Sequence, residues 1–318
     1  MKNRLFFSAI AVALLTFANC NKKHDISAPT PANPTIDSTT NPAPGNYSMA
    51  SVLASLAVPI KTVTIDAATG GSFTGNSGTR YTFRPNSFGT ATGTLITGNV
   101  DIQVAEYLNK ADMLFSGMAP MCDSNALLSG GEIYVSASQN GQQLQLMPGV
   151  SFTAQMPAPG VDPTGMTLFL GEKQGNTVKW QQWDPGIPDS MSHAGDSIRL
   201  MSWALNYCNA DRFMDHPNYQ NFAVALNAGL LALSTDSFNV STFYDNYNGV
   251  WPFLHVSAGV YVENHVPDIP VHFVAFGIIN GNFYGGILGA TPATGHTYTV
   301  SLKQTTPDEF KAQVAALK

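Results

Sequence analysis

Apolar and polar residues alternate with a period of two over much of the chain from about residue 59 onward. In VDIQVAEYL, residues 100 to 108, Val100, Ile102 and Val104 share one face and polar residues lie between them. Alternation of this kind over five to eight residues is typical of β-strands that bury one face. The pattern therefore predicts antiparallel strands, hardly any helix, and an all-β fold class.

Three Asn-Gly pairs mark predicted turns between such strands. They are Asn140-Gly141 in EIYVSASQNGQQLQL, Asn248-Gly249 in TFYDNYNGVWPFL, and Asn280-Gly281 in HFVAFGIINGNFYGGIL. Asn and Gly tolerate the positive φ angles that a two-residue hairpin turn requires. Each pair is therefore predicted to close a β-hairpin.

The length of this alternating region predicts more than one domain. About 260 residues follow residue 58, whereas one β-sandwich needs roughly 100. A segment with two prolines and two glycines, residues 185 to 197, is the predicted boundary. The chain is therefore predicted to form two tandem antiparallel β-sandwich domains, the first over residues 59–190 and the second over residues 198–303.

A short C-terminal helix is predicted over residues 304–318. Thr306 can cap it and Pro307 suits its first helical position. Phe310, Val314 and Leu317 then share one face, which predicts that this face packs against the β-structure.

The N-terminal residues follow a different pattern. Lys2 and Arg4 precede an apolar run from Leu5 to Phe17, which has the length of a signal-peptide core and is too short to span a bilayer. The small residues that follow lead into Cys20, and this order resembles the lipobox of bacterial lipoproteins, where the cysteine becomes the lipidated first residue. Residues 1–19 are therefore predicted to be a signal peptide and Cys20 a lipid anchor. An ordinary signal peptide cleaved nearby is the alternative.

Residues 20–58 are predicted to be a lipid-anchored, disordered tether. The stretch SAPTPANPTIDSTTNPAPGN is rich in Pro, Ser, Thr and Asn and has almost no large apolar side chain. Loss of residues 1–19 leaves 13 Lys and Arg against 21 Asp and Glu, a net charge of −8. Nucleic-acid binding is disfavoured, because it depends on basic residues that neutralise phosphates. The membrane, through the lipid anchor, is the first predicted partner.

Four segments resemble a domain arrangement found in Bacteroidota envelope lipoproteins of unknown function. Three of them resemble the first domain: GGSFTGNSGTRYTFRPNSF (70–88), TGNVDIQVAEYLNKADMLFSG (97–117) and LLSGGEIYVSASQNGQQLQLMPG (127–149). The fourth, WALNYCNADRF (203–213), resembles the opening of the second. The first domain is in turn distantly similar to the β-sandwich of zonula occludens proteins, ankyrins and netrin receptors. The resemblance implies an outer-membrane lipoprotein of the cell envelope, facing the periplasm or the surface, with no assigned catalytic residue.

Motifs for catalysis or metal binding are not found, so no catalytic residue, metal site or cofactor is predicted. The run GGSFTGNSG lacks the Lys-Ser/Thr ending of a phosphate loop and is interpreted as turns between short strands. His255, His265 and His272 could meet on one metal ion if neighbouring strands brought them together, but spacings of ten and seven do not fix such a meeting, and solvent-facing or hydrogen-bonded strand histidines are the favoured interpretation. In the animal sandwich proteins a His-Phe-Ser step can cleave itself, but here Val274 follows His272-Phe273, so self-cleavage is not predicted.

The two remaining cysteines, Cys122 and Cys208, lie in different predicted domains. A disulfide between them could persist in an exported protein and would join the two sandwiches. Two separately buried thiols are the alternative, and we favour it because sequence does not show that the two Cβ atoms approach to about 4 Å.

The predicted ligand-binding residues are Tyr244, Asp245, Asn246, Tyr247 and Asn248, in an aromatic hairpin. Aromatic rings beside amide and carboxylate groups suit sugars, which offer C–H faces for stacking and hydroxyls for hydrogen bonds. Core packing combined with turn formation would give the same pattern, since alternate strand residues point inward.

Two functions follow from these features. The first is a non-enzymatic, lipid-anchored cell-envelope protein that is a binding or structural module for a protein or glycan partner. The alternative is a carbohydrate-processing hydrolase or accessory whose carboxylates, such as Asp245 with Glu263 or Asp268, meet only in the fold. Such an enzyme needs two carboxyl groups about 5 to 10 Å apart in a cleft.

Replacing Cys20 tests the predicted anchor. Cys20→Ala should release the protein from the membrane fraction without changing its melting temperature, because the predicted anchor precedes a tether and contacts no core. Cell fractionation and thermal unfolding measure the two effects. An undegraded variant that stays in the membrane fraction contradicts the prediction.

Overall fold

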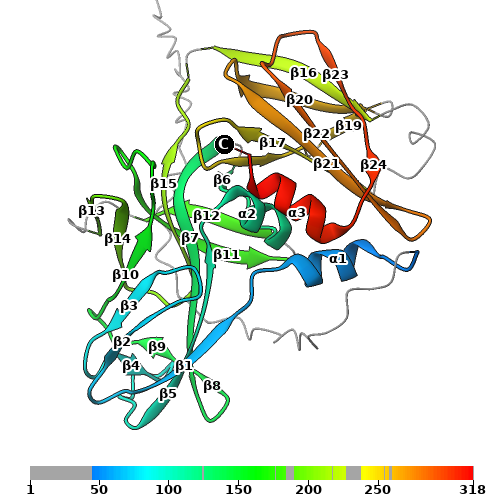
Figure 1. Cartoon of the computed structure of the whole chain (residues 1–318). Helices are drawn as coiled ribbons and strands as arrows, with labels where there is room; N and C mark the ends of the chain where they lie inside the picture. The colour runs from blue at the N-terminus through cyan, green and yellow to red at the C-terminus, as the bar shows by residue number, and fades with distance from the viewer. Residues whose placement is uncertain are drawn as a thin grey trace, which may run out of the picture. The chain divides into compact units, whose positions relative to one another are not determined.

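The computed structural model describes residues 45–123, 125–175, 177–183, 190–216, 218–226, 238–253, 255–257 and 260–317. The predicted signal peptide, Cys20 and the tether up to residue 44 lie outside these residues. The described chain is all-β, with several antiparallel sheets and short helices, as the alternation predicted (Figure 1).

Two sheets enclose the first apolar core. In spatial order, the large sheet is β1 (Lys61–Asp66), β5 (Asn99–Tyr107), β7 (Asn125–Gln139), β15 (Tyr207–Phe213), β11 (Thr167–Gln174) and β12 (Thr177–Gln182), with β6 (Met121–Cys122) and β8 (Gln142–Gln143) also paired to β7. The facing sheet is β13 (Met191–Ala194), β14 (Ser197–Ser202), β10 (Phe152–Pro157), β3 (Arg80–Phe83) and β2 (Gly71–Thr74). A further short pair is β4 (Phe88–Gly89) with β9 (Gln145–Leu146). Val100, Ile102 and Val104 of β5 point into the core between the sheets, on the face that the alternation predicted.

The first pair of sheets extends beyond the boundary expected at residues 185–197. Residues 185–189 of that segment lie outside the described residues. β13 lies within its remaining part, β14 begins at its last residue and β15 follows, and all three strands pair within the first two sheets. β14 pairs with β10, and β15 lies between β7 and β11. The physical reason is that Cys208 and Ala210 of β15 complete the first core. The chain passes to the second pair of sheets between Phe213 and Tyr219.

The second pair of sheets begins at β16 and encloses a separate core. One sheet is β18 (Val250–Pro252), β17 (Phe238–Tyr244), β21 (Val271–Ile279), β22 (Asn282–Ala290) and β24 (Lys303–Gln304). The other is β19 (His255–Ser257), β20 (Val260–Pro267), β16 (Tyr219–Leu226) and β23 (Thr297–Val300). β23 runs parallel to β16. Phe222, Trp251 and Phe273 are among the rings that fill the space between these sheets.

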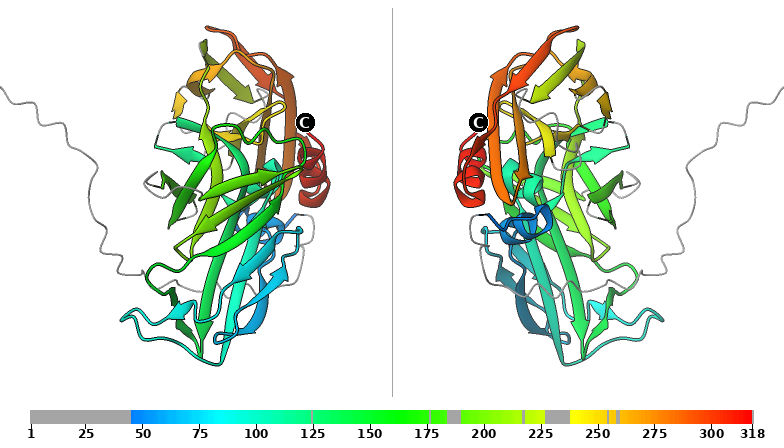
Figure 2. Two further views of the ribbon diagram at one scale, coloured as in Figure 1. Left: turned by 90° about the vertical axis from the view of Figure 1, so that its left-hand side faces the viewer. Right: turned by 90° about the vertical axis from the view of Figure 1, so that its right-hand side faces the viewer.

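A third core joins the helices to both pairs of sheets. The helices α1 (Met49–Leu56), α2 (Lys110–Ser116) and α3 (Pro307–Ala315) bury side chains in one cluster with the outer face of the large sheet and the outer face of β17, β21 and β22. Figure 2 shows α3 against the outer side of the β21–β22 pair. Phe310 lies 6.1 Å from Phe276 and 5.6 Å from Phe283, between ring centroids. None of the helices in the described part of the chain is long and apolar enough to cross a membrane.

The helix α3 confirms the predicted C-terminal helix. Thr306 caps it through the backbone N–H of Glu309, and the Glu309 carboxylate accepts from the Thr306 N–H, which completes a capping box. Pro307 stands at the first helical position. Phe310 and Val314 are buried in the third core and Leu317 packs against it, as their shared face predicted.

The helix α1 corrects the predicted extent of the tether. Residues 20–58 were expected to be a tether, but Val52 and Leu56 are buried in the third core. The Tyr47 N–H donates to the Gly281 carbonyl over 2.9 Å, and Lys311 Nζ donates to the Leu56 carbonyl over 2.8 Å. ASVLASL follows a Pro-rich stretch, but its apolar residues Val52 and Leu56 recur with helical spacing.

Truncating Phe310 tests the third core. Phe310→Ala should lower the free energy of unfolding by about 3–5 kcal/mol, because it removes a buried ring that contacts α2 and β22. Phe213→Ala is a matched control: that ring is 41% exposed, so its loss should cost about 1 kcal/mol or less. Urea unfolding measures both. Equal losses in the two variants contradict the assignment.

Candidate functional site

The predicted ligand-binding hairpin joins β17 to β18, but its turn differs from the expected one. Asn246, with φ of 62°, adopts the left-handed conformation that was expected at Asn248-Gly249. Gly249 is not one of the described glycines with a positive φ. A Cβ at this position would lie 3.1 Å from the Tyr244 ring and 3.3 Å from the Leu127 carbonyl oxygen. Close packing, not turn geometry, therefore favours glycine at position 249.

Two of the five predicted residues fix this turn against the large sheet. Tyr244 is buried, and its carbonyl accepts a hydrogen bond from Lys110 Nζ over 2.9 Å. The Asn248 carbonyl accepts from the Ser129 N–H over 2.9 Å, and its Nδ2 donates to the Leu108 carbonyl over 3.4 Å. Tyr244 and Asn248 therefore hold the turn in place.

A third predicted residue, Asp245, joins the turn to the neighbouring strand β21. Its Oδ1 lies 2.6 Å from Nδ1 of His272 on β21. Burial lowers the pKa of Lys110 to about 8, although Asp245 nearby acts in the opposite direction. Asn246 and Tyr247 are left exposed at the tip, with Tyr247 40% exposed. Of the five predicted residues, these two present their side chains to the outside.

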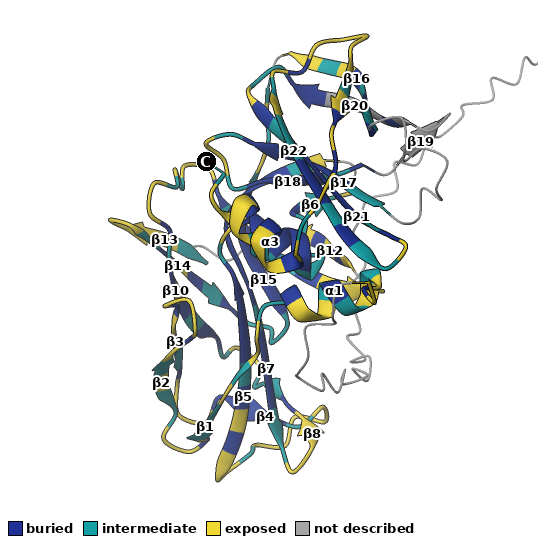
Figure 3. Ribbon diagram, turned by 45° about the vertical axis from the view of Figure 1, so that its right-hand side comes forward, coloured by how far each residue is buried: buried dark blue, intermediate teal, exposed yellow. Residues whose placement is uncertain are grey.

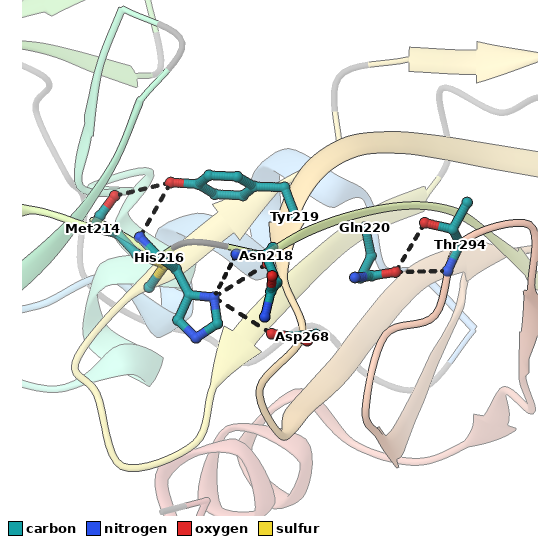
Figure 4. A network of polar contacts seen from close by, with 7 residues as sticks. All are labelled: Met214, His216, Asn218, Tyr219, Gln220, Asp268 and Thr294. Atoms are coloured by element: carbon teal, nitrogen blue, oxygen red, sulfur yellow. Dashed lines mark hydrogen bonds and ion pairs between the residues drawn. The ribbon is translucent and has the colours of Figure 1, made fainter.

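Asp245 and Asp268, two of the carboxylates of the hydrolase alternative, contact different histidines. Asp245 pairs with His272, whereas Asp268 lies 3.4 Å from Nδ1 of His216. Figure 4 shows the latter pair at the passage from β15 to β16, where the Tyr219 hydroxyl also donates to the Met214 carbonyl. The side chain of Glu263 lies outside the described residues, as do those of His255 and His265.

Cys122 and Cys208 are both free thiols. The sequence left open whether they form a disulfide or are buried separately. Cys208 is fully buried, and its thiol donates to the Ser202 hydroxyl over 3.3 Å. Burial raises the pKa of Cys208 to about 12. Cys122 is partly buried at the edge of the third core. No disulfide therefore joins them, and their structural role is that of small packed side chains.

The backbone N–H groups of the Gly-rich run bind a carboxylate side chain of the same protein, that of Glu106. The carboxylate of Glu106 accepts from the Ser77 N–H over 2.7 Å and from the Thr79 N–H over 2.8 Å. A Cβ at Gly75 would lie 2.1 Å from Glu106 Oε2, so only glycine fits there. The interpretation of this run as turns between short strands is confirmed, since β2 lies within it.

A buried pair of carboxyl groups was not found from the sequence. Glu132 on β7 and Asp211 on β15 are fully buried on the outer face of the large sheet. Asn209 Nδ2 donates to both, over 3.1 Å to Glu132 and 2.5 Å to Asp211, and Ser129 Oγ donates to Asn209 Oδ1. Glu132 Oε2 and Asp211 Oδ1 have no hydrogen-bond partner within the described chain. Burial, and for Glu132 also the nearby Asp211, raises the pKa of both groups well above their ordinary values.

The described surface also has a cavity beside the β7–β8 hairpin. Its volume is about 420 Å³, within the range that holds small ligands. The lining combines amides and hydroxyls with a few apolar side chains: Thr90, Ala91, Thr92, Ile96, Gln139, Asn140, Gln142, Gln143 and Leu144. The sequence signal was the amide run QNGQQ, which was interpreted only as a turn.

Comparison with known proteins adds no family assignment. No family model matches this sequence, and no curated protein is similar to it. Within the described residues, no group of three or more His, Cys, Asp or Glu side chains could hold a metal ion.

Replacing Glu132 tests the buried carboxyl pair. A carboxyl group whose pKa is higher in the folded state stabilises the fold fully below its unfolded pKa, here 4.5, and loses that contribution as pH rises through the folded pKa. Glu132→Gln should therefore melt about 2–4 °C higher than the native chain at pH 8, for a gain of roughly 1 kcal/mol. The difference should shrink toward pH 4. A variant that is less stable at pH 8 contradicts the raised pKa.

Proposed function

We propose that this protein is a non-enzymatic, lipid-anchored binding module of the cell envelope. The anchor is Cys20, and the chain up to about Gly45 is the tether. The partner is a protein or a glycan of the envelope. The N-terminal pattern supports the anchor and the tether, and the exposed surface of the fold supports the binding site.

The observation that carries the proposal is the fixed turn between β17 and β18. Tyr244, Asp245 and Asn248 are engaged by contacts within the chain, so the exposed Asn246 and Tyr247 are held on a rigid support. A rigid exposed aromatic ring loses little conformational entropy when it binds. Tyr247 provides a flat apolar face and a hydroxyl, and Asn246 provides an amide. Such groups suit recognition of a protein or sugar surface.

Alanine substitutions at Tyr247 and Trp251 separate binding from packing. Tyr247→Ala should leave the free energy of unfolding within about 0.5 kcal/mol of the native value and weaken binding to isolated cell envelopes at least tenfold. Trp251 is 7% exposed and belongs to the second core, so Trp251→Ala should cost roughly 3–5 kcal/mol.

Co-sedimentation of the purified chain with envelope fragments, alongside thermal unfolding, measures both effects. Gln181→Ala is the surface control, because the Gln181 side chain is exposed on β12. Unchanged sedimentation of the Tyr247→Ala protein would remove the turn as a binding site.

A further inference from the structure

The smaller sheet around the first core carries positive charge on an acidic chain. Its strands β13, β14, β10, β3 and β2 contain no Asp or Glu, but they contain two arginines, Arg80 on β3 and Arg199 on β14. The acid nearest to Arg199 in sequence, Asp196, lies in the turn between β13 and β14. The whole chain has a net charge of −6. This sheet therefore differs in charge from the protein as a whole.

The register aligns both arginines in one row on the outer face of this sheet. Arg80 pairs with Thr74 on β2 and with Gln155 on β10. Gln155 pairs in turn with Arg199, which pairs with Ser192 on β13. The residues between them in sequence, such as those on either side of Gln155, point into the first core. All five residues of the row are exposed, and Figure 3 shows exposed or half-buried positions on each of these strands. We call these five residues the basic row.

Neither arginine of the basic row is neutralised by a contact within the described part of the chain. Arg212 forms an ion pair with Asp162 over 3.3 Å, whereas the guanidinium groups of Arg80 and Arg199 have no ion pair or hydrogen bond with any described residue. Glu106 reaches the loop before Arg80, but its carboxylate is buried and accepts from backbone N–H groups of that loop. Both guanidinium groups are therefore available to an anionic ligand.

A third cation is fixed at one end of the basic row. Lys61, the first residue of β1, donates from Nζ to the Thr74 carbonyl over 2.7 Å. Between the two arginines, Gln155 Nε2 donates to Ser197 Oγ over 3.0 Å, which orients the amide. The row therefore presents positive charge at three points, with an oriented amide between the second and the third.

The spacing of these charges favours a linear ligand of low charge density. Arg80 and Arg199 flank β10, so the strands that carry them are two strand spacings, roughly 10 Å, apart. The next row on this face includes Thr82, Thr153 and Met201 and has no charge. A flat anionic membrane is matched by cations spread over an area, not along one line. A nucleic acid carries a phosphate on every nucleotide, and such dense charge is repelled by a chain of negative net charge.

An acidic polysaccharide fits both the charges and the neutral groups of the row. An Arg guanidinium binds a carboxylate through two parallel hydrogen bonds. Amide and hydroxyl groups donate and accept hydrogen bonds, as sugar hydroxyls require. Where only every second sugar is acidic, successive carboxylates of an extended chain are separated by the length of two sugars, which is similar to the interval between the two arginines.

We propose that the basic row binds an acidic polysaccharide in which every second sugar carries a carboxylate. The polysaccharide lies across the strands, with one carboxylate on Arg80, the next on Arg199, and the neutral sugar between them against Gln155. This assignment deepens the proposed function and rests on it, because it names an acidic glycan as the envelope partner. The basic row and the turn that carries Tyr247 belong to different sheets, so substitutions test the two surfaces separately.

Biolayer interferometry of the purified full chain on immobilised hyaluronan tests the assignment, because hyaluronan carries one carboxylate in each disaccharide. Dextran is the neutral probe. Single-stranded DNA and vesicles of phosphatidylcholine with phosphatidylglycerol are the phosphate probes. We expect binding to hyaluronan that weakens as the NaCl concentration rises, and no binding to dextran.

Substitutions at the two arginines separate charge from geometry. Arg80→Gln with Arg199→Gln should raise the Kd for hyaluronan at least tenfold, because both carboxylate contacts are lost. Arg80→Lys with Arg199→Lys should raise the Kd less, because the charge remains and only the planar fork is lost.

The matched control is the double substitution Lys173→Gln with Lys303→Gln, which removes two positive charges from exposed positions of β11 and β24. The control should bind hyaluronan with a Kd close to that of the native chain, since neither lysine belongs to the basic row. Melting temperatures within about 2 °C of the native value show that the variants are folded.

Four results overturn the assignment. They are no binding to hyaluronan, equal binding to dextran, tighter binding to either phosphate probe, and a Kd of the Arg→Gln variant that matches that of the control. If the native chain does not bind hyaluronan but still co-sediments with cell envelopes, the basic row is excluded while the proposed binding function stands. If envelope co-sedimentation also fails in the native chain, the proposed function itself is excluded.

Discussion

The packing of Phe310 against Phe115, Phe276 and Phe283 is the contact on which the rest of the structure depends. These rings come from α3, α2, β21 and β22, so one cluster brings together the end of the chain, its middle and both pairs of sheets. The buried face of α1 joins the same cluster. A Cβ on Gly285 would lie 2.3 Å from the Phe310 ring, so even the strand beneath it is adapted to this contact. The two pairs of sheets are therefore predicted to be one cooperative unit.

This third core also determines which surfaces are available for binding. It covers the half of the outer face of the large sheet that includes Ala105 and Tyr107 of β5 and leaves Thr64 and Asp101 in the other half exposed. The turn between β17 and β18 lies beside the core, where Lys110 and Ser129 hydrogen-bond to its carbonyls. A turn held from both sides presents Tyr247 without a large entropic cost on binding. The packing of the third core thus accounts for the rigidity of the turn between β17 and β18 and for the exposure of part of the large sheet.

Local features of this fold could be predicted from the sequence, and long-range ones could not. The turns at Asn140-Gly141 and Asn280-Gly281 and the cap at Thr306 depend on a few adjacent residues, and all three are confirmed. The placement of β15 depends on pairing with β7 and β11, which are distant in sequence. Composition predicted a boundary at residues 185–197 but did not show that β13, β14 and β15 join the first two sheets.

The candidate sites follow the same rule. The hairpin that carries Tyr247 was found because its aromatic residues are adjacent, but the contact of Asn248 with Ser129 comes from another sheet. Glu132 and Asp211 are 79 residues apart, and only the register of β7 with β15 brings them together.

Native-state hydrogen exchange as a function of denaturant tests the shared core most directly. The slowest amides of β7 and β21 should exchange with the same free energy and the same denaturant dependence; opening of β21 and β22 while β5 and β7 stay protected would contradict a single cooperative unit.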